Sequence, residues 1–191
     1  MRIRQMLSAA LLIAVSSGVG LAQETFTVDT AHSTVLFRIK HLNTSYSYGR
    51  FNDVSGSFVI DKTAPAKSAL DLTVKTASVD TANADRDKHL KGPDFFNVKQ
   101  FPTATFKSTA VRPGKDASTL DVTGNLTING VTKSVPIVVE LTGGGPSPFK
   151  DYREGLEARL RINRHDFGIQ FMPQGLGDDV VLIVSLEGIR K

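Results

Sequence analysis

The stretch LDVTGNLTINGVTKSVPIVVEL, residues 120–141, decides the fold class. In its first half the apolar or small residues fall at even positions, and in its second half they fall at odd positions. This period of two is typical of β-strands with one buried face. Asn129-Gly130 separates the halves, and this pair favours a two-residue type I′ turn because both turn residues need positive φ. The stretch therefore predicts a hairpin of two strands, residues 120–128 and 131–141.

A two-residue turn also fixes the register of this hairpin. It pairs Ile128 with Val131 and Leu126 with Lys133, and directly paired residues share a face of the sheet. The two apolar sets then form one continuous face, on which Lys133 is a charged exception near one end of the sheet. Either its ammonium group extends out to solvent, as lysines beside apolar surface commonly do, or it is available to the polar headgroup of a ligand.

The same alternation recurs along the chain. It is clear at residues 34–40, 69–75 and 156–162, and less regular at residues 51–61, 103–111 and 180–189. Residues 80–99 lack it and can hold one or two short helical turns, at residues 84–90 and 94–98. No linker composition divides the chain, so the sequence predicts a single all-β domain of eight strands.

Eight one-sided strands without intervening helices favour an antiparallel meander. Closure removes exposed strand edges, so we expect an eight-stranded antiparallel lipocalin-like β-barrel; a two-sheet sandwich is the alternative. The inward faces of a barrel form either a packed core or an apolar pore. The residues predicted to line this interior are Val35, Phe37, Ile39, Phe58, Leu72, Phe106, Val122, Ile137, Val139 and Leu160. Their side chains offer large apolar area and almost no hydrogen-bond donors, so we predict that they bind the alkyl or prenyl chain of a lipid.

The first 22 residues have the layout of a secretory signal peptide. Arg2 and Arg4 form a cationic head, residues 7–15 are small or apolar, and Gly20-Leu21-Ala22 resembles a cleavage site. We predict cleavage between Ala22 and Gln23, which leaves residues 23–191 as the exported domain, in the periplasm or the medium. The alternative is an uncleaved membrane anchor.

Composition and motifs exclude several classes of function. The chain has no cysteine, so disulfides, thiolate metal sites and cysteine nucleophiles are absent. Two of its 23 Lys and Arg residues lie before residue 23, which leaves 21 against 19 Asp and Glu, too balanced a charge for nucleic-acid binding. The four histidines show no metal-ligand spacing. No nucleophile elbow or phosphate-binding loop occurs, so we expect no metal, no required cofactor and no catalytic residue.

Several motifs together resemble the YceI-like family, also called the lipid/polyisoprenoid-binding family. The resemblance covers nearly all of residues 23–191, with two departures: Asn97 stands where the family usually has Asp, and Asn129 where it commonly has His. The matching motifs, with x for any residue, are Val28-Asp29-x-x-His32-Ser33-x-Val35-x-Phe37, Gly49-x-Phe51, Val54-x-Gly56-x-Phe58, Arg86-Asp87-x-His89-Leu90, Phe95-Phe96-Asn97-Val98, Phe101-Pro102-x-Ala104-x-Phe106, residues 124–133, Arg164-x-Asp166-Phe167-Gly168-Ile169 and residues 177–180.

The resemblance implies a lipocalin-like barrel that binds a long-chain isoprenoid, a quinone or another amphiphile, without a settled catalytic activity. The predicted function is therefore an exported lipid-binding protein that acts in transport, sequestration or a stress response. The alternative is an enzyme that acts on a lipid at the barrel mouth through the block from Arg86 to His89. A transient contact with a membrane surface and a homodimer both remain open. The candidates for recognising a headgroup are His41, Arg86, His89 and Lys133.

Overall fold

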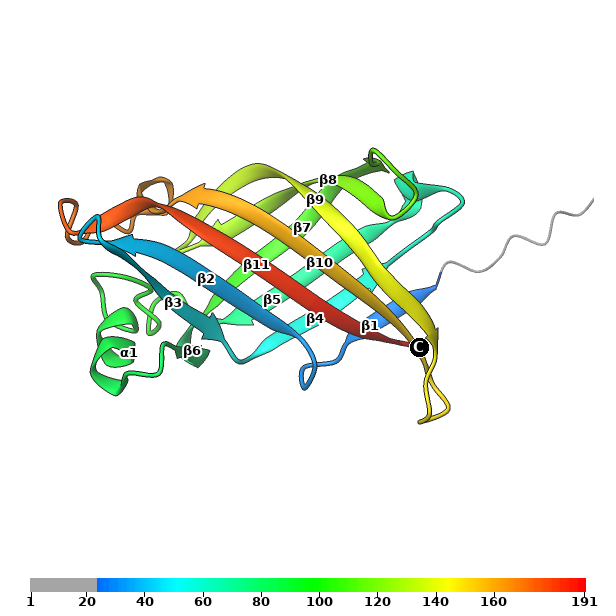
Figure 1. Cartoon of the computed structure of the whole chain (residues 1–191), viewed down its shortest axis with the longest axis horizontal. Helices are drawn as coiled ribbons and strands as arrows, with labels where there is room; N and C mark the ends of the chain where they lie inside the picture. The colour runs from blue at the N-terminus through cyan, green and yellow to red at the C-terminus, as the bar shows by residue number, and fades with distance from the viewer. Residues whose placement is uncertain (1–23) are drawn as a thin grey trace, which may run out of the picture.

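The structure is a computed structural model that describes residues 24–191. The described chain forms eleven strands, one α-helix and three 3₁₀ helices (Figure 1). The strands are β1 (Thr25–Val28), β2 (Thr34–His41), β3 (Ser45–Phe51), β4 (Val54–Val59), β5 (Ala69–Lys75), β6 (Val79–Asp80), β7 (Thr103–Pro113), β8 (Thr119–Ile128), β9 (Val131–Pro146), β10 (Tyr152–Asn163) and β11 (Leu176–Arg190). The helices are α1 (Ala84–Leu90), η1 (Pro65–Lys67), η2 (Thr76–Ser78) and η3 (Arg164–Phe167).

The predicted signal peptide and its cleavage site lie outside the described residues, so export remains a prediction. Among the residues that are described, none of the helices has the length and apolar character needed to cross a bilayer.

The sheet closes on itself through β1, which pairs with both β4 and β11. The closed ring runs β1-β4-β5-β7-β8-β9-β10-β11 and every pairing in it is antiparallel. After the turn that follows β1, β2 continues along β11 and turns back into β3. The prediction of an eight-stranded antiparallel barrel is therefore confirmed.

The predicted hairpin register is confirmed as well. Ile128 pairs with Val131 and Leu126 with Lys133, while Asn129 and Gly130 have φ of 51° and 72°. The Asn129 side chain also donates a hydrogen bond of 2.6 Å to the carbonyl oxygen of Phe95. The turn thereby fastens this hairpin to the segment that contains α1.

Residues 51–61 were predicted as one strand, and this is wrong. β3 ends at Phe51 and β4 begins at Val54, because the intervening backbone bonds elsewhere. The amides of Asn52 and Asp53 donate to the carbonyl and the hydroxyl of Ser78, at 3.2 and 3.1 Å. The chain therefore leaves its pairing with β2 and enters its pairing with β5 at this bend.

The two ends of the barrel differ. At the end near β1, the rings of Phe26 and Phe58 stack at 5.3 Å and are each 1% exposed, so side chains fill the interior. At the opposite end the strands separate: residues 131–137 of β9 pair only with β8, while β10 beyond Arg159 pairs only with β11. The buried Phe167 of η3 packs into the core at this end.

The segment 81–102 lies at the same end, beside β3 (Figure 1). α1 forms where the sequence predicts it, and the side chain of Asn83 caps its first turn by accepting from the Arg86 amide at 2.9 Å. The second predicted helical turn is absent. Residues 94–98 form hydrogen-bonded turns instead, with Asn97 at φ 42°.

Candidate functional site

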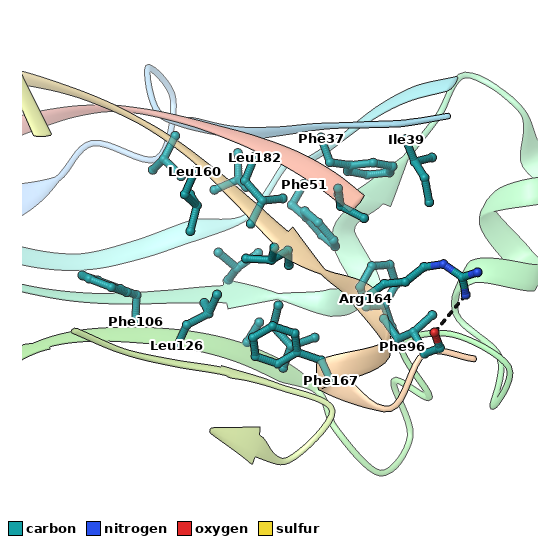
Figure 2. Close-up of a pocket in the computed structure, with 18 of the residues that line it drawn as sticks. Phe37, Ile39, Phe51, Phe96, Phe106, Leu126, Leu160, Arg164, Phe167 and Leu182 are labelled. Atoms are coloured by element: carbon teal, nitrogen blue, oxygen red, sulfur yellow. Dashed lines mark hydrogen bonds between the residues drawn. The ribbon is translucent and has the colours of Figure 1, made fainter. Parts of the chain in front are cut away.

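An apolar cavity of about 450 Å³ occupies the barrel interior on the side of α1 and η3 (Figure 2). Strands from all around the barrel contribute to its wall, together with the segments 81–96 and 164–172. The polar exceptions in its lining are His41, Ser47, Tyr48, Thr81, Arg86, His89, Thr105, Glu157 and Arg164. Such a lining offers large apolar area and few hydrogen-bonding groups.

Most of the residues predicted to line an interior pore do lie in this wall. They are Val35, Phe37, Ile39, Leu72, Phe106, Ile137, Val139 and Leu160. The structure brings them together from β2, β5, β7, β9 and β10. Their contact with a lipid stays a prediction.

Phe58 and Val122 do not line the cavity, which corrects the sequence prediction. Phe58 stacks on Phe26 in the filled end of the barrel, and Val122 is 1% exposed within the packed core. Both side chains point inward, as their alternation predicts. Alternation identifies the face of a strand, however, and carries no information about depth along the barrel axis.

The sequence analysis missed several wall residues. Leu182 and Val184 pair with Phe37 and Val35, but residues 180–184 are apolar on both faces, so periodicity could not select the inward set. Phe51, Phe96 and Phe167 also line the cavity. All three phenylalanines lie in motifs that resemble the YceI-like family, so this resemblance could have identified them from the sequence.

Glycines on neighbouring strands hold two phenylalanine rings against the barrel wall. A Cβ atom at Gly49 would lie 2.3 Å from the ring of Phe37, and one at Gly124 would lie 2.3 Å from the ring of Phe106. Each ring therefore occupies the space that a side chain on the adjacent strand would need. This arrangement keeps the two rings close to the wall of the cavity, which they line.

The cavity opens to solvent between the β2–β3 turn, α1 and the loop after η3. Tyr48 lines it and is 61% exposed, and Met172 lines it and is 40% exposed. His41, Arg86 and His89, which were predicted to meet a headgroup, all lie in the lining near this mouth. Lys133 does not: it shares the face of Leu126 as the register requires, but its side chain is exposed outside the cavity.

Hydrogen bonds already hold the polar groups of the Arg86 to His89 block. Arg86 donates from Nε to Thr81 Oγ1 and from a terminal nitrogen to the Thr81 carbonyl, both at 2.7 Å. Asp87 accepts from the Thr81 hydroxyl at 2.5 Å, and His89 Nε2 lies 2.9 Å from Asp94. These contacts fasten α1 to its own segment, and they leave Arg86 and His89 with one face toward the cavity.

Arg164 is a charged residue that is almost completely buried, with 2% of its surface exposed, at the mouth side of the cavity (Figure 2). Its guanidinium donates to the carbonyl oxygens of Gly177, Ile169 and Phe171 at 2.9 Å each and to that of Leu176 at 3.2 Å. Burial lowers the pKa of Arg164, against the opposing effect of Asp178 at 3.8 Å. Arg164 therefore ties the loop after η3 to the start of β11.

A second polar cluster lies at the filled end of the barrel, away from the cavity. Ligand atoms of Asp29, His32 and Glu187 lie within 4.8 Å of one another. The guanidinium of Arg153 donates to Asp29 at 2.9 Å, to Asp151 at 3.1 Å and also to Glu187. We assign this cluster to an ion-pair network, since Arg153 supplies the positive charge that its carboxylates need.

Comparison with known proteins identifies the family. Residues 26–188 match the YceI-like domain. The chain belongs to the YceI-like family. Its YceI-like relatives include a UPF0312 protein of Pseudomonas aeruginosa strain LESB58, which is 48% identical over 160 residues that cover 84% of this chain and 83% of that protein. Protein YceI of Salmonella newport is 42% identical over 183 residues, covering 96% and 94%.

Solved structures resemble this YceI-like chain over most of its length. BcnA of Burkholderia cenocepacia matches with a TM-score of 0.77 and 26% identity, over 84% of this chain and 98% of that one. A Campylobacter jejuni YceI protein matches with a TM-score of 0.67 and 30% identity, over 97% and 99%. A polyisoprenoid binding domain from Saccharophagus degradans matches with a TM-score of 0.64, over 87% and 98%, and at 18% identity this likeness shows the fold alone.

Proposed function

We propose that this YceI-like protein binds a long-chain amphiphile, with an isoprenoid, quinone or fatty tail inside the barrel and the headgroup at the mouth. The apolar cavity of about 450 Å³, open at one end, is the observation that carries this proposal. A sugar or nucleotide would leave its polar groups unpaired against such a wall. An alkyl or prenyl chain has no hydrogen-bonding groups to leave unpaired. When it enters the cavity, it loses only the contact of its apolar surface with water.

The expected affinity follows from the area that the tail buries. Each buried CH₂ group contributes about 0.8 kcal/mol, so about ten groups contribute roughly 8 kcal/mol before ordering costs. A net gain near that value corresponds to a dissociation constant of about 1 μM. His41, Arg86 and His89 lie where a headgroup would emerge, so their substitution is expected to change headgroup preference and to retain tail binding.

The proposal includes export, with residues 1–22 as the signal peptide and the periplasm or medium as the site of action. The N-terminus of the protein recovered from the periplasmic fraction should be at or near Gln23. Recovery from the cytoplasm with Met1 retained would refute this part of the proposal. Light scattering on the same sample distinguishes a monomer from a homodimer.

Native mass spectrometry of the gently purified full-length gene product tests the binding function. A lipid carrier should retain an amphiphile in stoichiometric amount. After delipidation it should bind a polyprenyl phosphate, an isoprenoid quinone or a fatty acid in titration. Val139→Asp places a carboxylate in the cavity wall and should abolish uptake, with circular dichroism as the check that the barrel still folds. Absence of uptake of all three ligands by the folded natural protein would refute the proposal.

The same sample addresses conversion of the lipid. A carrier should release its ligand chemically unchanged, both in the natural protein and in His89→Ala. Turnover that disappears in His89→Ala would instead favour the enzymatic alternative at the Arg86 to His89 block.

A further inference from the structure

Exposed apolar side chains gather around the mouth of the cavity. Of the eight large hydrophobic residues that are exposed in the described part of the chain, five lie there. We call these five the mouth rim; they are Leu42, Tyr46, Tyr48, Phe171 and Met172, with exposed fractions between 38% and 61%. Scattered exposed apolar residues are ordinary, but a contiguous group of them indicates an interaction surface.

Contacts place Leu42, Phe171 and Met172 beside one another at the mouth. Tyr46 and Tyr48 lie on the adjoining β3, where they pair with Lys40 and Arg38. The amide of Leu42, in the β2–β3 turn, donates to the carbonyl of Gly175 at 2.7 Å, which sets this turn beside the loop that carries Phe171 and Met172. The ring of Phe171 lies 4.8 Å from that of His89, at the end of α1. The β2–β3 turn and the β10–β11 loop lie at the same end of the barrel in Figure 1, at the left of the view.

Two cations beside the rim have no anionic partner within residues 24–191. Arg38 and Lys40 lie over the ring of Tyr46, at 4.3 and 4.8 Å from its centre. Among the described residues, neither has a carboxylate within 4.0 Å, whereas the nearby Arg161 pairs with Asp179 at 3.0 Å. Arg38 and Lys40 therefore present uncompensated positive charge on the outer face of β2.

A surface hollow of about 400 Å³ adjoins these cations. Arg38, Lys40, Tyr46 and Arg161 line it, together with Asp178 and Asp179. Both of these carboxylates already have a cation nearby, since Asp179 pairs with Arg161 at 3.0 Å and Asp178 lies 3.8 Å from Arg164. The hollow thus retains a net positive character that suits an anionic group.

We propose that the mouth rim, with Arg38 and Lys40, docks on the surface of an anionic phospholipid bilayer. Tyrosine and lysine side chains combine an apolar body with a polar tip, which suits the boundary between headgroups and acyl chains. Cations near such a surface gain from its negative potential. This docking places the cavity mouth against the bilayer, so an amphiphile can enter without crossing water. The purpose of this docking rests on the proposed lipid-binding function. The docking itself does not depend on that function.

Sedimentation with phospholipid vesicles tests the docking directly. The protein should bind vesicles of phosphatidylcholine mixed with phosphatidylglycerol, and high salt should weaken the binding. Each cation at an anionic surface contributes a factor of about 5, so Arg38→Gln/Lys40→Gln should lower the affinity about 25-fold. Leu42→Ser/Met172→Ser should weaken binding to the same vesicles by removing inserted apolar area.

A double substitution at the opposite end of the barrel serves as the control. Phe149 is 77% exposed beside Lys150 in the β9–β10 connection, so Phe149→Ser/Lys150→Gln removes one apolar group and one cation far from the mouth. Its vesicle affinity should equal that of the natural protein. If the natural protein does not bind these vesicles, or if the control variant loses as much affinity as the mouth variants, the docking proposal is overturned.

A decyl-tailed quinone added from solution separates this proposal from lipid binding itself. Arg38→Gln/Lys40→Gln should take up the soluble quinone as the natural protein does, and should acquire it more slowly from anionic vesicles. Vesicle binding without any quinone uptake would refute the proposed function and leave the docking standing. Unimpaired acquisition from vesicles by the double variant would refute the docking.

Discussion

Ala158→Leu offers a quantitative test of whether the barrel interior is an empty binding cavity or a packed core. Ala158 lies on β10 between Val139 and Val184, with which it pairs, and all three side chains line the cavity. The substitution adds three carbon atoms that point into the lumen. In an empty cavity they bury apolar surface and should stabilise the protein by about 1–2 kcal/mol. In a packed core the same atoms would overpack the site and cost about 1–3 kcal/mol.

The same substitution shortens the longest tail that the cavity can hold. The cavity of about 450 Å³ accommodates a tail of limited length, and a methylene group takes about the volume of a water molecule in the liquid, roughly 30 Å³. Three added carbons remove space for about three methylene groups. A fatty acid of about 16 carbons should therefore lose about 2.4 kcal/mol, or about 50-fold in affinity. One of about eight carbons should bind almost unchanged, because it still fits.

Urea denaturation and titration of the delipidated protein with both fatty acids measure these effects. Ala110→Leu is the control, since Ala110 is exposed on β7, and it should change neither stability nor affinity. The cavity interpretation is wrong if Ala158→Leu lowers the unfolding free energy by more than about 1 kcal/mol. It is also wrong if both tail lengths lose affinity equally.

Three further substitutions test other parts of the structure. Arg164→Met should lower the unfolding free energy by about 2–4 kcal/mol in urea denaturation, because four carbonyl groups lose their buried donor; an unchanged midpoint would contradict this role. Gly49→Ala should displace the Phe37 ring into the lumen, so both thermal stability and affinity for long tails should fall. The hydrogen bond from His32 is the main cause that lowers the pKa of Asp29. Its stabilising contribution is therefore present above the unfolded-state pKa of about 3.9 and is lost as the pH falls through the lower folded value. Asp29→Asn should flatten the dependence of stability on pH below about 4, and an unchanged slope would refute the assignment.

The sequence by itself determined the local features of this protein. Alternation identified the face of most strands, and Asn129-Gly130 set the register of the β8–β9 hairpin, as the structure confirms. Both features could be predicted locally because the period of a strand and the geometry of a two-residue turn depend on backbone sterics within a few residues. A closed eight-stranded barrel was expected from the number of one-sided strands and the need to pair their edges, but β1, the strand that closes the ring, was not among the strands that the sequence predicted.

Only the tertiary structure decided where each inward side chain lies along the barrel axis. Phe58 and Phe106 have the same alternating pattern, yet Phe58 fills the closed end and Phe106 lines the cavity. Depth depends on the tilt and stagger of strands far apart in the chain. The burial of Arg164 is equally non-local, because its four acceptors come from residues 169–177 after that loop has folded back. The mouth, its rim and the position of Arg38 and Lys40 beside it arise in the same way, from contacts that no single stretch of sequence contains.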